Sequence, residues 1–158
     1  IPCDHTERLC FYWWPRLPPV EGWHHDREQS LVYSANALAP DGVTFANAET
    51  VIYAKALYKP RIPETESLEQ LIADDKAQFA KNVPGVLIAE ATALKTGDGQ
   101  VVRSFTYFPP KEGNWERVSY GEEGEYYLIF TVSSRTKDGY AKAVPTYESL
   151  IQRYKEKL

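Results

Sequence analysis

The sequence has no methionine, only two cysteines and only three histidines among its 158 residues. The absence of methionine leads us to expect a processed chain, as removal of a signal peptide would produce. No apolar run approaches the ~18 residues that a membrane-spanning helix needs, so we expect no transmembrane segment. The 18 basic residues are outnumbered by 22 acidic ones, and no basic stripe is present. Nucleic acid is therefore not the expected partner.

The sequence also lacks the short motifs of nucleotide-dependent and serine-dependent enzymes. Its nine glycines fall at predicted turns or element boundaries, and neither a dinucleotide fingerprint nor a P-loop occurs. No nucleophile-elbow motif is present, and all three histidines lie within the first 25 residues. We therefore expect a protein that is not an enzyme, and keep a hydrolase with an unrecognised site as an alternative.

The two cysteines suggest a cellular location. Cys3 and Cys10 are separated by six residues, which is neither a zinc-finger nor a thioredoxin spacing. In an exported protein such a pair predicts a small disulfide loop, and an oxidising compartment would allow the bridge to form. We therefore expect a periplasmic or secreted protein with a Cys3–Cys10 disulfide. The alternative is two unpaired thiols.

Residues 1–23 differ in composition from the rest of the chain. They contain four of the eleven prolines and three of the four tryptophans. This proline density disfavours a helix and a central strand, so we expect an extended N-terminal arm, followed by one domain over residues 24–158. Its aromatic side chains either pack along the sheet or form a surface for a partner or ligand. The candidates for that surface are Tyr12, Trp13, Trp14 and Trp23.

Beyond the arm, hydrophobic periodicity predicts an α+β fold. Helical spacing of apolar residues appears over 67–81 and 139–158, and Ser67 with Gln70 forms a capping box. Segments rich in β-formers are the predicted strands: 30–35, 49–58, 85–94, 100–108, 114–120 and 126–133, with turns at 96–99 and 121–124. Adjacent strands in sequence favour antiparallel pairing. We expect an α-β-α sandwich in which two helices flank a mainly antiparallel sheet of about six strands.

This order of elements resembles the Mog1/PsbP-like superfamily. The resemblance spans roughly residues 20–158. It is carried by Gly22-Trp23, by the helix opening Ser67-Leu68-Glu69-Gln70-Leu71, by the central meander and by the closing segment Tyr147-Glu148-Ser149-Leu150-Ile151-Gln152-Arg153-Tyr154. It implies a non-enzymatic binding or assembly protein whose partner is a protein or a small ligand. The superfamily shares no catalytic residues, so none is transferred to this chain, and fold alone does not determine function.

A metal site is the main alternative function. All three histidines, His5, His24 and His25, lie in the N-terminal part of the chain together with Asp26, and zinc or another divalent metal accepts such ligands. However, neighbouring side chains on an extended segment point to opposite sides, so His24 and His25 would not easily ligate one ion. The simpler interpretation is two exposed or half-buried histidines beside Trp23.

Acid–base chemistry has one candidate position. Glu116 and Arg117 are neighbours on a predicted strand, so their side chains should point to opposite faces, and one of them should need a partner under a helix. We expect a structural ion pair there rather than catalysis. We also expect the two helices to leave no cleft lined by convergent titratable groups, whereas a hydrolase would require a nucleophile and a base in contact.

Overall fold

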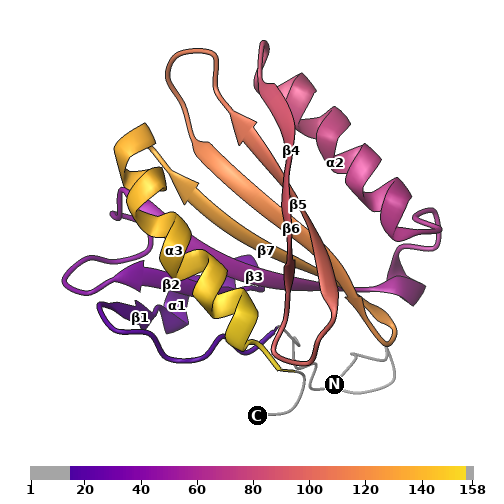
Figure 1. The fold of residues 1–158 in the computed structure, drawn as a ribbon, viewed down its shortest axis with the longest axis horizontal. Coiled ribbons are helices and arrows are strands. Elements are labelled where there is room, and N and C mark those ends of the chain that lie inside the picture. Colours follow the sequence, from indigo (N-terminus) through magenta and orange to yellow (C-terminus); the bar gives the residue numbers. More distant parts are fainter. Residues whose placement is uncertain (1–14, 156–158) are drawn as a thin grey trace.

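The computed structural model describes residues 15–155, which form one antiparallel sheet with helices on both of its faces (Figure 1). Within this range the strands are β1 (Trp23–His25), β2 (Asn36–Pro40), β3 (Thr50–Tyr58), β4 (Leu87–Lys95), β5 (Val101–Phe108), β6 (Trp115–Glu123) and β7 (Tyr126–Ser134). The α-helices are α1 (Arg27–Tyr33), α2 (Leu68–Asn82) and α3 (Lys137–Arg153), and a short 3-10 helix, η1, covers Lys59–Arg61.

The strands are arranged in the order β1-β2-β3-β7-β6-β5-β4. Every neighbouring pair is antiparallel, and β7 lies at the centre between β3 and β6. The β4–β5 and β6–β7 hairpins are sequential, whereas the β3–β7 pair joins residues 68 to 84 positions apart in the chain, from Tyr58↔Tyr126 to Thr50↔Ser134. The centre of the sheet therefore depends on long-range pairing.

One face of the sheet packs against α3, and we call it the α3 face. Alternate residues of the central strands point to this face, including Ile52, Leu128 and Phe130. Tyr147 and Leu150 of α3 lie against them and are almost fully buried. This larger core cluster extends from β2 to β4.

The opposite face carries α2, and we call it the α2 face. Here Ile72 of α2 packs with Phe105, Val118 and Tyr120 of β5 and β6. Phe79 stacks on Tyr107 with 3.9 Å between ring centroids. Because this smaller cluster involves mainly β5 and β6, α2 covers only the half of its face that lies towards β4.

The predicted antiparallel α+β fold is confirmed, but two details of the sheet differ from the expectation. Within residues 15–155 the sheet has seven strands and not about six. The additional strand is β1, in which Trp23 pairs with Pro40 and His25 with Leu38. The end of the predicted arm is therefore part of the sheet, because its backbone pairs with the edge of β2 that no other strand occupies.

The strand predicted over 30–35 is wrong. Residues Arg27–Tyr33 form α1, and the strand begins only at Asn36. Asp26 begins this helix by accepting a hydrogen bond from the backbone amide of Gln29, and Ser34 ends it in a left-handed conformation with φ of 50°. The N-cap stabilises the helical first turn despite the β-branched and aromatic residues that follow.

The other predicted elements agree with the structure apart from their ends. The segment 67–81 is helical as α2, with Ser67 as N-cap, and α3 begins two residues before the predicted start at 139. The predicted turn over 121–124 is shorter, because β6 continues to Glu123 and the chain reverses at Gly124, whose φ is +57°. Residues 121–123 are not β-formers, but they belong to β6 because they pair with Tyr126, Tyr127 and Leu128 of β7.

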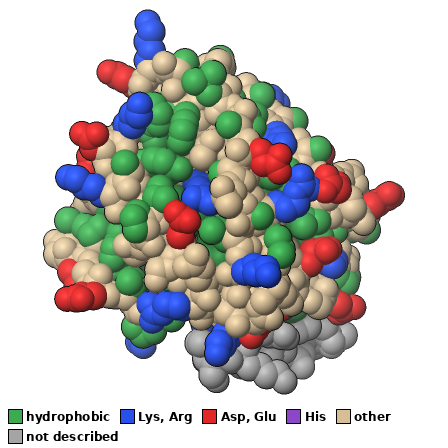
Figure 2. Space-filling view, viewed as in Figure 1, with side chains coloured by type: hydrophobic (Ala, Val, Ile, Leu, Met, Phe, Trp, Pro, Cys, Tyr) green, Lys and Arg blue, Asp and Glu red, His purple; other side chains and the backbone are tan. Residues whose placement is uncertain are grey.

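Several predictions fall on residues outside the described range. Cys3, His5, Cys10, Tyr12, Trp13 and Trp14 are among them, so the disulfide, the export of the protein and most of the aromatic surface stay predictions. No helix formed by residues 15–155 has the length and apolar character needed to cross a bilayer. On the molecular face drawn in Figure 2, acidic and basic side chains are interspersed around hydrophobic ones.

Candidate functional site

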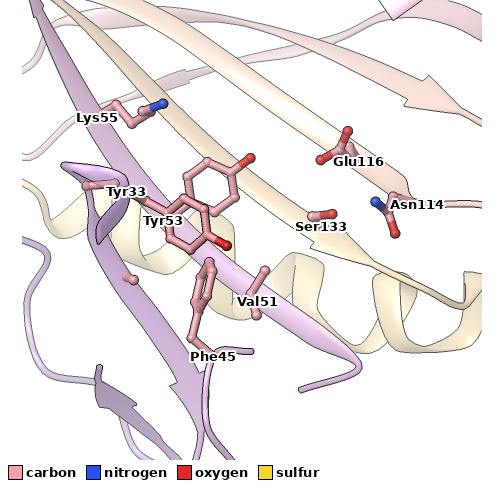
Figure 3. A pocket seen from close by; sticks show the side chains of 10 residues that line it. Tyr33, Phe45, Val51, Tyr53, Lys55, Asn114, Glu116 and Ser133 are labelled. Atoms are coloured by element: carbon pink, nitrogen blue, oxygen red, sulfur yellow. The ribbon is translucent and has the colours of Figure 1, made fainter. Parts of the chain in front are cut away.

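The α2 face contains a cleft where α2 leaves the sheet uncovered. Its volume is about 290 Å³, at the lower end of the range for small-molecule sites. The floor is formed by β2, β3, β6 and β7, and α1 and the following loops form the rim. The lining residues are Tyr33, Ala35, Ala37, Phe45, Val51, Tyr53, Lys55, Asn114, Glu116 and Ser133 (Figure 3).

Strand register explains why polar side chains meet in this cleft. Glu116 of β6 lies opposite Ser133 of β7, and Ser133 lies opposite Val51 of β3, so the three form one row across the sheet. Lys55 lies four residues further along β3, beside Ile129. Since side chains alternate along each strand, all of these point to the α2 face. Figure 3 accordingly shows Glu116 and Lys55 at opposite ends of the cleft.

One wall of the cleft is aromatic. The rings of Tyr33 and Phe45 are 5.7 Å apart, and those of Phe45 and Tyr53 are 6.1 Å apart in an edge-to-face arrangement. The backbone amide of Phe45 donates a 2.9 Å hydrogen bond to the Asp26 carboxylate, which fixes the loop beside α1. Because three different elements supply these rings, the wall forms only in the folded chain.

The other end of the cleft carries a carboxyl group with an unusual proton affinity. Burial raises the pKa of Glu116 from 4.5 to about 7, and repulsion from Asp75 on α2 adds to this, while a hydrogen bond with Ser133 acts in the opposite direction. Glu116 therefore changes charge near neutral pH. Such a group in a cleft is a candidate for a functional role.

A chain of hydroxyl groups connects this region to α2. The hydroxyls of Tyr107 and Tyr120 are 2.8 Å apart, and Tyr120 donates a hydrogen bond to the Asp75 carboxylate. Burial raises the pKa of Asp75 and raises the pKa of Tyr107 to about 12. Burial likewise raises the pKa of Tyr120 and of Tyr53. The tyrosines therefore remain neutral at physiological pH and act as hydrogen-bonding groups.

The raised pKa of Glu116 makes a prediction about stability. Between its unfolded pKa of 4.5 and its folded pKa of about 7, the folded chain binds more protons than the unfolded chain. The contribution of Glu116 to the free energy of unfolding is fully present below pH 4.5 and is lost as the pH rises through 7. We therefore expect Glu116→Gln to stabilise the protein by about 1–3 kcal/mol near pH ~8 and to change little near pH ~5.

Urea unfolding of the wild type and of Glu116→Gln at the two pH values measures this difference in the free energy of unfolding. Glu122→Gln is the matched control, because Glu122 is on the same face of β6 but is exposed and lies 3.0 Å from Lys59. The control should show no comparable pH dependence. Equal effects of Glu116→Gln at both pH values would contradict the prediction.

The predicted metal ligands that the structure describes are separated. His24 and His25 point to opposite faces of β1, as expected from an extended segment. The His24 Nδ1 atom lies 3.4 Å from Asp41 Oδ1, and the His25 Nδ1 atom lies 2.7 Å from Asn36 Oδ1.

Asp26, the third described candidate ligand, caps α1. Its carboxylate accepts hydrogen bonds from the backbone amides of Phe45 and Gln29, which lower its pKa. No group of three potential metal ligands gathers within residues 15–155. His5 lies outside this range.

The remaining site predictions have mixed outcomes. Trp23 is half-buried and packs against the core on the α3 face, away from the cleft. Arg117 points under α3 and pairs with Glu148, as expected for a structural ion pair, whereas Glu116 faces the cleft. The cleft differs from the expectation that the helices cover the sheet, because α2 covers only part of its face, and the charged groups Glu116 and Lys55 lie at its opposite ends.

Sequence reasoning missed Tyr53, Lys55, Asp75 and Ser133. The sequence pattern places Asp75 on α2 without singling it out, yet its side chain is half-buried beside Tyr120. The available signal was weak: Tyr53 and Lys55 are polar residues at alternate positions of an otherwise apolar strand. That alternation indicates that one face of the strand is polar, but it does not indicate that this face forms the floor of a cleft.

Comparisons with known proteins give a fold and no family. No protein-family model and no curated protein matches the chain. Among solved structures, the chain is similar to PA94 from Pseudomonas aeruginosa, a protein of unknown function described as a candidate regulator. The TM-score is 0.52 and the identity is 14%, over 75% of this chain and 79% of that one. At this identity the likeness shows a shared fold alone.

Proposed function

We propose that the protein is a non-enzymatic binding protein of the Mog1/PsbP-like type that holds a small organic ligand in the cleft of the α2 face. The supporting observation is the cleft itself, which places an aromatic wall opposite polar groups on a rigid sheet. Concave sites of this composition bind small ligands, because the apolar wall supplies affinity and a few polar groups fix orientation. The cleft replaces the arm as the proposed binding surface.

The volume of the cleft limits the size of the ligand. About 290 Å³ accommodates a small molecule or one large side chain of a partner. Tyr33 on the rim is 54% exposed, so its ring can contact an entering molecule. Ligands that combine one ring with one polar group therefore match the lining best.

Binding of three small probes tests the proposal. Phenethyl alcohol, phenethylammonium and phenylpropionate share a ring and differ in charge. We expect at least one to shift the backbone amide resonances of the cleft strands, with a dissociation constant on the order of 1 mM. Asn114→Trp should weaken this binding about tenfold or more, because Asn114 is an exposed lining residue whose replacement fills the cleft.

Lys142→Trp serves as the control, since Lys142 is exposed on α3 on the opposite face. This variant should bind the probes like the wild type. The absence of any shift with all three probes would overturn the proposal. Turnover of 4-nitrophenyl acetate that disappears in Ser133→Ala would also overturn it, in favour of the hydrolase alternative.

A further inference from the structure

The charges in the cleft are distributed unequally between its two ends. At one end, the charge of Lys55 lies close enough to Asp75 to lower the pKa of that carboxyl. At the other end, Glu116 has no lysine or arginine partner within ion-pair distance among residues 15–155. Its identified neighbours are the Ser133 hydroxyl and the charge of Asp75. The Glu116 end therefore has an uncompensated carboxyl group.

A half-buried carboxylate without a cation is unfavourable. Removal from water disfavours its charge, and only a nearby positive group or several hydrogen bonds offset that cost. A ligand that supplies a positive group would offset it. An anionic ligand would instead be repelled by Glu116 and Asp75.

The aromatic wall suits the uncharged part of such a ligand. The contiguous rings of Tyr33, Phe45 and Tyr53 provide an apolar surface. The cleft therefore favours a ligand in which a positively charged nitrogen, at the Glu116 end, is attached to an apolar body.

We propose that the ligand of the cleft is an organic ammonium ion, with its nitrogen directed to Glu116 and its apolar body against Tyr33, Phe45 and Tyr53. This inference rests on the proposed function, because it names the chemical class of ligand for the same cleft. The cavity volume of about 290 Å³ limits the apolar body to one ring or a short alkyl chain.

Binding of such a cation should depend on pH. The titratable groups whose charges act on Glu116 or on its neighbours are Asp75 from α2, Tyr53 from β3, Tyr107 from β5 and, at the far end, Lys55. The tyrosines stay neutral because burial raises their pKa. Glu116, with a pKa of about 7, is the group that changes charge near neutrality. We expect ammonium affinity to fall about tenfold from pH ~8 to pH ~6 as Glu116 is protonated.

Paired probes test the inference. Phenethylammonium and phenethyl alcohol have the same number of heavy atoms and differ in the terminal group. At pH ~8 we expect the ammonium to bind about tenfold more tightly than the alcohol. Glu116→Gln should remove this difference and the pH dependence of ammonium binding. Glu122→Gln, on the same face of β6, should behave like the wild type.

The outcomes distinguish the two proposals. If the alcohol binds as tightly as the ammonium, or if Glu116→Gln leaves the preference intact, the ammonium inference is overturned and the cleft remains a ligand site. If phenylpropionate binds most tightly, the inference is likewise overturned, and Lys55 becomes the group that selects the ligand. If none of the probes binds, the proposed function itself fails.

Discussion

Tyr147→Ala should lower the free energy of unfolding by about 3–5 kcal/mol, because it removes a whole aromatic ring from the larger core. Tyr147 is fully buried between α3 and the centre of the sheet. The core cluster to which it belongs also contains Leu128 and Phe130 of β7 and Leu150 and Ile151 of α3. These residues are themselves almost fully buried, so the neighbours cannot collapse completely into the space that the ring leaves.

The hydroxyl of Tyr147 adds a smaller, separable contribution. It donates a hydrogen bond of 2.7 Å to the backbone carbonyl of Phe130 and lies 2.7 Å from the Ser119 hydroxyl. Tyr147→Phe keeps the ring and removes these bonds, so we expect a loss of about 1–2 kcal/mol. The ratio of the two effects then separates ring packing from hydrogen bonding.

Urea denaturation at neutral pH measures both variants. Lys142→Ala is the matched control on α3, because its side chain is exposed and alanine favours a helix. It should change stability by less than about 0.5 kcal/mol. A loss below about 2 kcal/mol for Tyr147→Ala would mean that α3 does not dock on the sheet as described.

The elements predicted correctly are those with a strong local pattern. In β7 the apolar residues Leu128, Phe130 and Val132 alternate with residues of the opposite face, and they do line the core under α3. In α2 the capping serine and the spacing of Leu68, Leu71 and Ile72 locate the start of the helix. Such patterns are local, so the sequence alone contains enough information to predict them.

The α1 region shows where a local pattern misleads. Val32 and Tyr33 are β-formers, yet they are helical and, like Leu31, more than half exposed. The deciding interactions are the Asp26 cap and the hydrogen bond from the Ala37 amide to the Ser30 hydroxyl, which join α1 to β2. A single cap can outweigh weak strand propensity over seven residues.

The cleft could not be predicted because it depends on strand order. Tyr53, Glu116 and Ser133 become neighbours only when β3 and β6 both pair with β7. The sequence indicates which residues share a face of each strand, but it does not specify which strands adjoin. The extent of sheet that α2 covers is also a tertiary property. The sequence predicts that either Glu116 or Arg117 needs a partner under a helix; Arg117 is that residue, and the cleft around Glu116 is not predicted.

Arg117 illustrates the separation of the two faces, and its removal should produce the second large loss of stability. Its side chain is only 8% exposed and lies under α3. The guanidinium donates hydrogen bonds of 2.7 Å to the Ser104 hydroxyl and 2.9 Å to the Thr92 carbonyl, and it lies 3.6 Å from the Glu148 carboxylate. One side chain therefore connects β5, β4 and α3.

The bond to Thr92 has a specific structural role. The register of the β4–β5 ladder shifts between Ala91 and Leu94, so Thr92 lies within an irregularity of the edge strand. Arg117 satisfies its carbonyl group there, which an interrupted ladder would otherwise leave without a protein donor. Removing the guanidinium should therefore loosen this part of β4 as well as the contact with α3.

We expect Arg117→Ala to lower the free energy of unfolding by about 3–4 kcal/mol, because it removes charge-assisted hydrogen bonds and leaves a cavity under α3. Arg103→Ala is the matched control: Arg103 is on β5, on the α2 face, and pairs with the largely exposed Glu69. That loss should stay below about 1 kcal/mol. Similar losses for both variants would contradict the structural role of Arg117.

A binding measurement separates Arg117 from its neighbour Glu116. Because successive side chains of β6 point to opposite faces, Arg117→Ala should weaken the fold without changing the composition of the cleft. At a temperature where the variant is folded, it should bind phenethylammonium like the wild type, whereas Glu116→Gln should bind it about tenfold more weakly. Amide hydrogen exchange in β4 should show the reverse order: faster exchange in Arg117→Ala, and unchanged or slower exchange in Glu116→Gln, which stabilises the fold near pH ~8. Two adjacent residues would then have opposite effects on stability and binding, as their positions on opposite faces require.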